Sequence, residues 1–399
     1  MKMTKRSTLA TLALAALTAM GAFGSGLSIP APLGGHFMAA LAMISRFELT
    51  HTRPPFHIDT VRVGNRDVPV TEEVALDLPF GKLLHFAKDV DTPQPRIMIV
   101  APLSGHFATL LRETVRTMLP DHDVYITDWA NARDVPPSAG RFGFNDYIDH
   151  VIKFLEFLGP GAHALAVCQP CVQVLAATAS MSAQKHPCTP RSMTLMGGPI
   201  DARVNPSLVN ALAFDHDVDW FENNLIATVP MRYGGAGRRV YPGFVQLSAF
   251  MNMNMARHKQ AHRTLYQHLA DNELEKAQAI KDFYDEYFAV LDLTAEFYLE
   301  TVSWVFQEAR LARGDLEHRG ERVNCAAIKR TALLTVEGER DDVCSLGQTQ
   351  AAHELCTSLR PYMKRHHMQT GVGHYGVFSG KRWQTQIYPI VRNHIETME

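Results

Sequence analysis

Cys168 stands where a short apolar run changes into an Ala-rich segment, in the pentapeptide Ala166-Val167-Cys168-Gln169-Pro170. A residue between a buried parallel strand and the first turn of the next helix lies at the carboxyl edge of the sheet, where open α/β folds place their chemistry. The start of a helix favours a thiolate, so Cys168 is a candidate nucleophile. A cysteine can also serve simply as a small buried apolar side chain. We expect this of the other cysteines, Cys171, Cys188, Cys325, Cys344 and Cys356.

Two later segments could supply an acid and a base. The run TALLTVEGERDDV, residues 331–343, predicts a strand that turns at Gly338 and brings Asp341 over the sheet edge. Asp342 is the second candidate, and either aspartate could instead be an ordinary turn residue. His374 follows in the glycine-rich loop GVGHYG, where an imidazole can move between a nucleophile and a leaving group. The order nucleophile, acid, base is the chain order of the triad in a fold that carries its nucleophile on such a strand-to-helix turn.

Acyl transfer at Cys168 would also need hydrogen-bond donors for the oxyanion of the tetrahedral intermediate. The backbone N–H of Gln169, directly after the nucleophile, is one candidate donor. The loop APLSGHF, which follows an earlier apolar run, offers Leu103 or Ser104 as the second. The same loop is compatible with a simple strand-to-helix turn in which Ser104 lies near the helix cap.

Short buried runs alternate with amphipathic segments along most of the chain. The runs that predict strands are residues 97–101, 124–127, 163–167, 193–196, 333–336 and, with a weaker pattern, 366–369. Helical patterns cover residues 107–118, 147–158, 171–179 and 349–359, with another after Trp383. The alternation predicts an α/β fold with a mostly parallel central sheet and helices on both faces. Residues 56–87 show two-residue alternation around a Gly-Asn turn and predict an antiparallel lead-in.

One interval of roughly 130 residues, between the fourth and fifth runs, is far longer than an ordinary connection. We therefore expect a largely helical cap at 203–322, inserted into a core of 56–202 and 323–399, with an N-terminal segment at 1–55. Apolar and aromatic residues from Tyr284 to Phe306 recur near a helical period and predict one long helix, whose stripe is mainly the cap's own core.

Composition argues against several other classes of protein. The 39 basic and 41 acidic residues are well mixed and give a net charge of -2, so no basic face for nucleic acid is expected. Six cysteines are too few and too scattered for a disulfide scaffold. Cys168 and Cys171 form a CxxC pair without a second pair at ligand spacing, so we expect no metal and no cofactor. A thioredoxin-like dithiol is the alternative for that pair.

Several stretches together resemble the intracellular polyhydroxyalkanoate depolymerases, from about Val61 to the C-terminus; among them are APLSGHFATLLRETVRTMLPDHDVYITDWANARDVP, AVCQPCVQVLAATA, MGGPIDARVNP, LLTVEGERDDV and GVGHYGVFSGKRW. The resemblance implies an α/β-hydrolase fold and cleavage of the ester bonds of stored poly(3-hydroxybutyrate) by a cysteine nucleophile. By motif it assigns the triad to Cys168, Asp341 and His374. The implied partner is the polymer or the surface of its granule, and the oligomeric state is left open.

Other functions would use some of the same residues. Related polyhydroxyalkanoate synthases have a cysteine elbow, but typically with glycines on its far side, where this chain has Pro170. Thiolysis with coenzyme A as acceptor would proceed through the same acyl-enzyme. A protein that coats granules without turnover would need none of Cys168, Asp341 and His374.

Two further expectations concern the polymer and the compartment. The Met-rich stretch FMNMNM, residues 250–255, is adaptable enough to face a polymer, although such methionines are also common in cores. Lys2, Lys5 and Arg6 precede an uncharged run, which is the arrangement of a secretory signal cleaved after Gly24, so that residues 1–24 would direct the chain to the periplasm or outside the cell. The run could also be a docking helix. A stored polymer and a thiol nucleophile favour the cytoplasm, on storage granules.

Overall fold

The computed structural model describes residues 50–253 and 255–399. Two compact units divide the chain: one comprises Glu48–Met255 and Asp282–Glu399, and the other includes Ala256–Lys281. The first unit holds the central sheet and every candidate catalytic residue. No helix in the described ranges is long and apolar enough to cross a membrane. The expectations for the N-terminal 49 residues lie outside the described residues.

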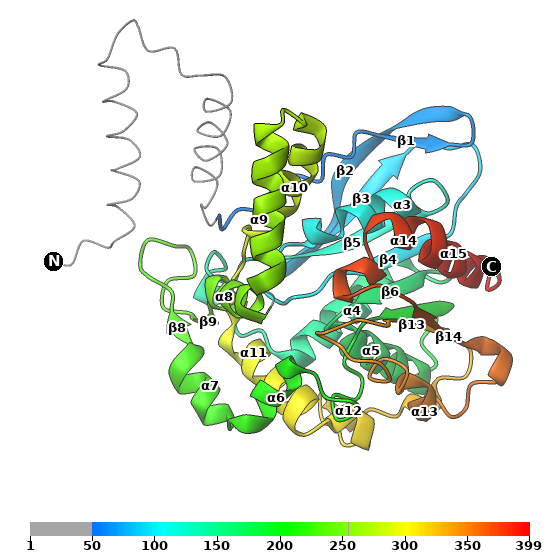
Figure 1. Ribbon diagram of the computed structural model, residues 1–399. Helices are drawn as coiled ribbons and strands as arrows, with labels where there is room; N and C mark the ends of the chain where they lie inside the picture. Colours follow the sequence, from blue (N-terminus) through cyan, green and yellow to red (C-terminus); the bar gives the residue numbers. More distant parts are fainter. Residues whose placement is uncertain (1–49, 254) are drawn as a thin grey trace, which may run out of the picture. The chain divides into compact units, whose positions relative to one another are not determined.

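Nine strands form the central sheet, in the order β1-β2-β3-β5-β4-β6-β7-β13-β14 (Figure 1). The antiparallel part consists of β1 (Thr60–Val63), β2 (Arg66–Leu78) and β3 (Gly81–Lys88), with β3 antiparallel to β5 (Asp123–Trp129). The parallel part continues through β4 (Arg96–Val100), β6 (His163–Val167), β7 (Ser192–Met196), β13 (Ala332–Gly338) and β14 (Lys364–Gln369). All six predicted runs form strands, and the antiparallel lead-in is confirmed. The run at 366–369 was wrongly expected to be buried, because β14 is the edge strand of the sheet and most of its residues are at least partly exposed.

Helices cover both faces of this sheet, as Figure 1 shows. One face packs against α4 (Phe144–Leu158) and α5 (Cys171–Ala183), and the other against α3 (Arg112–Met118) and α15 (Tyr388–Glu396). Strand β6 is apolar from Ala164 to Val167 because both of its faces are buried: Ala164 and Ala166 belong to the first cluster, Leu165 and Val167 to the second. The predicted α/β class, with a mostly parallel sheet between two helical layers, is confirmed.

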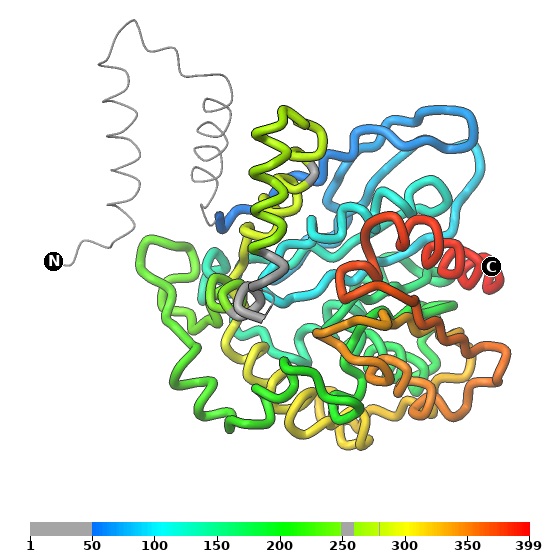
Figure 2. The backbone as a smooth tube through the Cα atoms, in the orientation of Figure 1, coloured from blue at the N-terminus to red at the C-terminus, as the bar shows by residue number. Residues whose placement is uncertain are grey.

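The long interval between β7 and β13, which runs from green through yellow in the tube view of Figure 2, is rich in helices. They are α6 (Leu208–Asp215), α7 (Val218–Leu225), α8 (Gly243–Met253), α9 (Met255–Ala270), α10 (Leu274–Tyr287), α11 (Ala295–Thr301) and α12 (Arg310–Arg313). A small antiparallel sheet joins β8 (Ala227–Thr228), β9 (Arg239–Tyr241) and β10 (Leu293–Thr294), and a two-stranded one joins β11 (Glu317–His318) and β12 (Glu321–Arg322). The side chains of the stretch 250–255 lie outside what the structure describes, so its role in facing a polymer stays a prediction.

Two predicted helices differ from the observed ones. The single long helix expected from Tyr284 to Phe306 is wrong, because α10 ends at Tyr287 and α11 begins at Ala295. Between them the main chain bonds elsewhere: the N–H of Leu291, for example, donates to the carbonyl of Gly105 at 3.0 Å. The helix expected over 349–359 is reduced to α13 (Ala352–Leu355). Apolar spacing alone could not reveal these competing main-chain partners.

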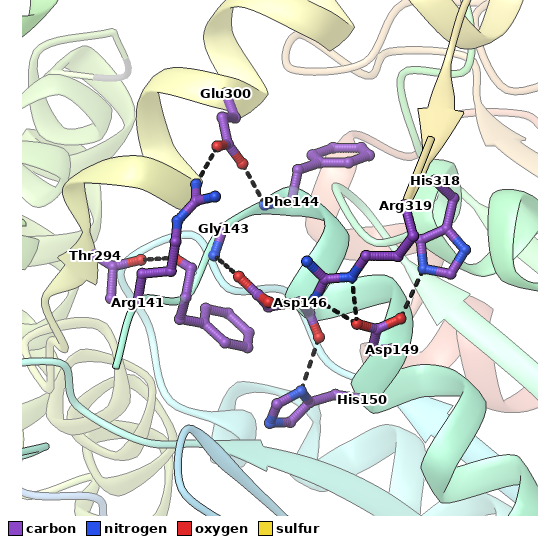
Figure 3. A network of polar contacts seen from close by, with 11 residues as sticks. Arg141, Gly143, Phe144, Asp146, Asp149, His150, Thr294, Glu300, His318 and Arg319 are labelled. Atoms are coloured by element: carbon purple, nitrogen blue, oxygen red, sulfur yellow. Dashed lines mark hydrogen bonds and ion pairs between the residues drawn. The ribbon is translucent and has the colours of Figure 1, made fainter. Parts of the chain in front are cut away.

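A polar network fixes the interval onto the beginning of α4 (Figure 3). Glu300 of α11 accepts hydrogen bonds from Arg141 and from the N–H of Phe144. On the other side of the helix, Asp149 accepts from His318 at 2.7 Å and from Arg319. Burial alone would raise the pKa of Asp149, but these two hydrogen bonds hold it below its ordinary value. The carboxylate is therefore charged at neutral pH and anchors the β11–β12 hairpin to the core.

Candidate active site

Cys168 occupies a sharp turn between β6 and α5. Its φ of +67° lies in the left-handed region, which a residue with a Cβ rarely adopts. The turn is held by main-chain hydrogen bonds: the N–H of Cys168 donates to the carbonyl of Met196 at 2.7 Å, and the N–H of Cys171 donates to the carbonyl of Cys168 at 3.1 Å. The half-buried Cys168 side chain is thus displayed at the carboxyl edge of the sheet by a strained strand-to-helix elbow.

The end of the neighbouring strand β7 presses directly against this elbow. A Cβ added at Gly198 would lie 2.2 Å from Cβ of Cys171 and 2.6 Å from the carbonyl oxygen of Cys168. Only glycine fits there without moving the backbone of the elbow. The buried thiol of Cys171 is enclosed at the same place, with its Sγ 3.4 Å from the carbonyl oxygen of Ala166. Burial raises the pKa of Cys171 well above its ordinary value, which keeps this thiol protonated.

Asp341 and His374 form a buried hydrogen-bonded pair. Nδ1 of His374 lies 2.8 Å from Oδ2 of Asp341, and because a carboxylate can only accept, the imidazole N–H donates. Oδ1 of the same aspartate accepts from the N–H groups of Val343 and Cys344, at 2.9 and 2.8 Å. Asp342, the alternative candidate, is exposed to solvent. The carboxylate of Asp341 is fixed by its own loop and leaves Nε2 of His374 available for chemistry.

The surroundings of His374 favour an imidazolium. Burial alone would lower the pKa of His374, but the charge of Asp341, the neighbouring Cys168 and their hydrogen bonds to the ring raise it well above its ordinary value. The adjacent residues Gly197 and Gly198 lie against His374 and against the carbonyl oxygen of Cys168, respectively, so the imidazole and the elbow are neighbours. The structure therefore brings together the three residues that the sequence proposed as nucleophile, acid and base.

Glycine also keeps the floor of this site open. Gly197, with a φ of +57°, follows β7, and a Cβ built on it would lie 3.4 Å from both Oδ2 of Asp341 and Cε1 of His374. Its N–H donates to the carbonyl of Val336 at 2.9 Å, which ties the end of β7 to β13. The pair Gly197-Gly198 therefore lies in contact with both the acid–base pair and the elbow.

The candidate oxyanion donors come from two adjacent strands. In the parallel pairing of β4 and β6, Val100 is opposite Ala166, so the loop that carries Leu103 and Ser104 leaves the sheet beside the elbow. Leu103 is buried and Ser104 is half-buried. The main chain of Gln169 begins the turn into α5. The N–H groups at the start of a helix point out of its N-terminal end and have no partner within the helix. Both candidate loops thus lie at the same edge as Cys168.

Some supporting residues were not singled out from the sequence. Glu337 of β13 is 1% exposed and accepts hydrogen bonds from the N–H groups of Gly347, Thr349 and Gln350. The hydroxyl of Thr349 in turn donates to the carbonyl of Gly198 and accepts from its N–H, both at 2.9 Å. A glutamate inside the apolar run TALLTVEG was the available signal, since a buried charge needs partners.

The carboxamides next to the nucleophile were missed as well. Gln169 and Gln173 are buried, and no hydrogen-bond partner for either amide lies within the described part of the chain. Gln169 lies in the turn before α5 and Gln173 in the first turn of that helix, in a segment that is otherwise apolar. Across the described residues, no cluster of three or more His, Cys, Asp or Glu side chains could hold a metal ion.

Comparison with known proteins identifies the family. The sequence profile described as PHB de-polymerase C-terminus matches residues 197–399, a span that contains Asp341 and His374 but not Cys168. No curated protein matches the chain. Similar solved structures include a monoacylglycerol lipase from Paleococcus ferrophilus, with 11% identity, 77% of this chain and 97% of that chain covered, and a TM-score of 0.45.

Another similar structure is the 2-hydroxy-6-oxo-6-phenylhexa-2,4-dienoate hydrolase from Rhodococcus sp. strain RHA1, with 13% identity, 82% of this chain and 99% of that chain covered, and a TM-score of 0.42. The profile covers just over half of the 399 residues. The chain therefore belongs to the poly(3-hydroxybutyrate) (PHB) depolymerase family, and its fold is that of an α/β hydrolase.

Proposed function

We propose that this member of the PHB depolymerase family hydrolyses the ester bonds of poly(3-hydroxybutyrate), or of a closely related polyhydroxyalkanoate, through an acyl-enzyme on Cys168. The observation that carries the proposal is the buried pair of Asp341 and His374 beside a cysteine on a strained elbow. A granule coat without turnover would not need such a pair.

Each residue has a defined part in the proposed reaction. The thiolate of Cys168 attacks the ester carbonyl, and the N–H of Gln169 with that of Leu103 or Ser104 binds the oxyanion. When the tetrahedral intermediate collapses, the bond to the alkoxide breaks, His374 gives that oxygen a proton, and a thioester remains on Cys168. His374 then takes a proton from water, whose oxygen attacks the thioester and releases the free acid. Asp341 keeps the imidazole in the productive orientation.

The partner and the compartment follow from this substrate. We place the enzyme at the surface of polymer granules in the cytoplasm, where a stored polyester would be found and where a free thiol stays reduced. N-terminal sequencing of the native protein tests the location. A mature chain that begins at Ser25 would mean export instead.

The test of function is turnover of native amorphous PHB granules, with product analysis in the presence and absence of coenzyme A. Wild-type protein should release 3-hydroxybutyrate or its short oligomers without coenzyme A, and Cys168→Ala should release none. A strict requirement for coenzyme A, with hydroxyacyl-CoA as product, would identify thiolysis. Binding to granules without any release of product would contradict catalysis altogether.

A further inference from the structure

A continuous set of aromatic rings leads away from the catalytic histidine. Tyr375 follows His374 directly, and their ring centroids are 5.9 Å apart at an interplanar angle of 84°. Tyr375 contacts two rings of α10, Phe283 at 6.2 Å and Tyr287 at 6.4 Å. Phe283 and Tyr287 are themselves stacked, with centroids 5.4 Å apart at 23°. We refer to Phe283, Tyr287 and Tyr375 as the aromatic strip.

The strip is bordered by both loops that serve the reaction. At one end Tyr375 belongs to the loop that carries the catalytic base. At the other, the ring of Tyr287 lies 5.1 Å from that of His106, which belongs to the same loop as Leu103 and Ser104. Leu291, four residues after Tyr287, donates to the carbonyl of Gly105 and so holds this part of the chain against that loop. The strip therefore lies at the rim of the reacting centre.

The three rings of the strip range from buried to exposed, so the strip offers an accessible ring supported by less exposed ones. Tyr287 is 2% exposed and acts as a backing ring, Tyr375 is half-buried, and Phe283 is 38% exposed. Its stack with Tyr287 and its edge contact with Tyr375 hold the Phe283 ring in place. A large apolar ring that is both exposed and fixed in place is ready to bind an apolar partner without a further loss of side-chain entropy.

We propose that the aromatic strip is a subsite for the polyester chain beyond the ester that is cleaved; this inference rests on the function proposed above. A poly(3-hydroxybutyrate) repeat presents a methyl group, a methylene group and an ester, and has no hydrogen-bond donor. Such a chain can be recognised mainly through apolar area and dispersion contacts, which flat aromatic rings supply. Ring contacts run without interruption from Phe283 to His374, so a chain held on the strip is continuous with one that reacts at Cys168.

The test compares Phe283→Ala with Phe157→Ala on a series of substrates: a butyrate ester, linear trimers and tetramers of 3-hydroxybutyrate, and amorphous granules. Phe157 is 48% exposed near the end of α4, toward the amino edge of the sheet, and is a matched control. The loss in kcat/KM of Phe283→Ala should grow with substrate length and reach about ten-fold on the longest substrates, a size typical of one aromatic contact. Phe283→Tyr should restore most of it, and Phe157→Ala should match wild type throughout.

Two outcomes would overturn the subsite. One is a loss for Phe283→Ala that is equal on all substrates or absent from all of them. The other is a change in oligomeric state on size-exclusion chromatography, without a length-dependent loss, which would assign Phe283 to contact with a second copy of the chain. Failure of the wild-type enzyme to release product from any 3-hydroxybutyrate oligomer or granule would instead refute the proposed function itself.

Discussion

The buried carboxylate of Glu337 should contribute both to the free energy of unfolding and to the geometry of the active site. Its Oε1 accepts from the N–H groups of Thr349 and Gln350 at 2.8 and 2.9 Å, and its Oε2 accepts from the N–H of Gly347 at 2.9 Å. With 1% of Glu337 exposed, water cannot replace it as acceptor. Removal of the carboxylate would leave the N–H groups of Gly347, Thr349 and Gln350 without their acceptor, at a cost of about 1–3 kcal/mol for each that is shielded from water.

We therefore expect Glu337→Ala to lower the free energy of unfolding by about 3–6 kcal/mol, because the donors share one loop and relax together in part. Glu337→Gln keeps one acceptor oxygen for Thr349 and Gln350, whose hydrogen bonds become neutral ones, but it places an amide NH2 donor where Oε2 accepts from the N–H of Gly347. The free energy of unfolding should fall by about 2–4 kcal/mol, from two weakened hydrogen bonds and one N–H group placed against another donor. Urea unfolding monitored by tryptophan fluorescence at neutral pH measures both values.

A control lies two residues further along the chain. Glu339 is exposed and accepts one backbone hydrogen bond, from the N–H of Gly371 at 2.7 Å. Glu339→Gln should cost less than about 1 kcal/mol, because water can serve the donor that it releases. Glu337→Gln should also lower kcat, since the loop that it holds positions Thr349 against Gly198. The reasoning is refuted if Glu337→Gln is as stable and as active as Glu339→Gln.

Further predictions concern two buried ion pairs, His374–Asp341 and Arg133–Asp292. The raised pKa of His374 means that the stability contributed by its pair with Asp341 is complete below about pH 6.5 and is lost as the pH rises through the higher folded pKa. The loss of stability in Asp341→Asn, measured by urea unfolding, should accordingly be largest below about pH 6.5 and should shrink as the pH rises through the folded pKa of His374, and a pH-independent difference would contradict the pairing. In Asp341→Asn the alkaline limb of the pH profile of kcat/KM should shift to lower pH, because His374 loses the carboxylate that raises its pKa. Asp292 is 2% exposed and binds Arg133 through two hydrogen bonds of 2.8 and 3.0 Å. Asp292→Ala should therefore cost about 3–5 kcal/mol in urea unfolding. Asp91→Ala, in an exposed ion pair, should cost less than about 1 kcal/mol, and equal losses would disprove the assignment of a buried pair.

The parallel core was accessible from the sequence because its strands are buried on both faces. Residues 163–167 are apolar at nearly every position, and the change to an Ala-rich helical pattern immediately after them located the elbow at Cys168. Chain order then selected Asp341 and His374. Their hydrogen bond depends on the turn after Gly338 and on the loop after β14. Hydrophobic periodicity does not predict the geometry of such loops.

What sequence reasoning missed depends on contacts between distant segments. The pattern from Tyr284 to Phe306 is nearly helical, yet the main chain of Leu291 bonds to Gly105 and interrupts the helix. Glu337 was passed over because its three partners are main-chain N–H groups from a later loop, and these leave no mark in side-chain identity. The need for glycine at position 198 could not be predicted either, because it arises from contact with Cys171 on another element. Periodicity reports which face of an element is buried, but it does not report what that face meets.

The central claim is that Cys168 carries the acyl group. The most direct measurement is mass spectrometry of enzyme quenched with acid during turnover of an activated ester of a short 3-hydroxybutyrate oligomer, followed by peptide mapping. Wild-type protein and Cys171→Ala should both carry one hydroxyacyl group on Cys168, and Cys168→Ala should carry none and be inactive. A label on Cys171, or full turnover by the Cys168→Ala variant, would contradict the account.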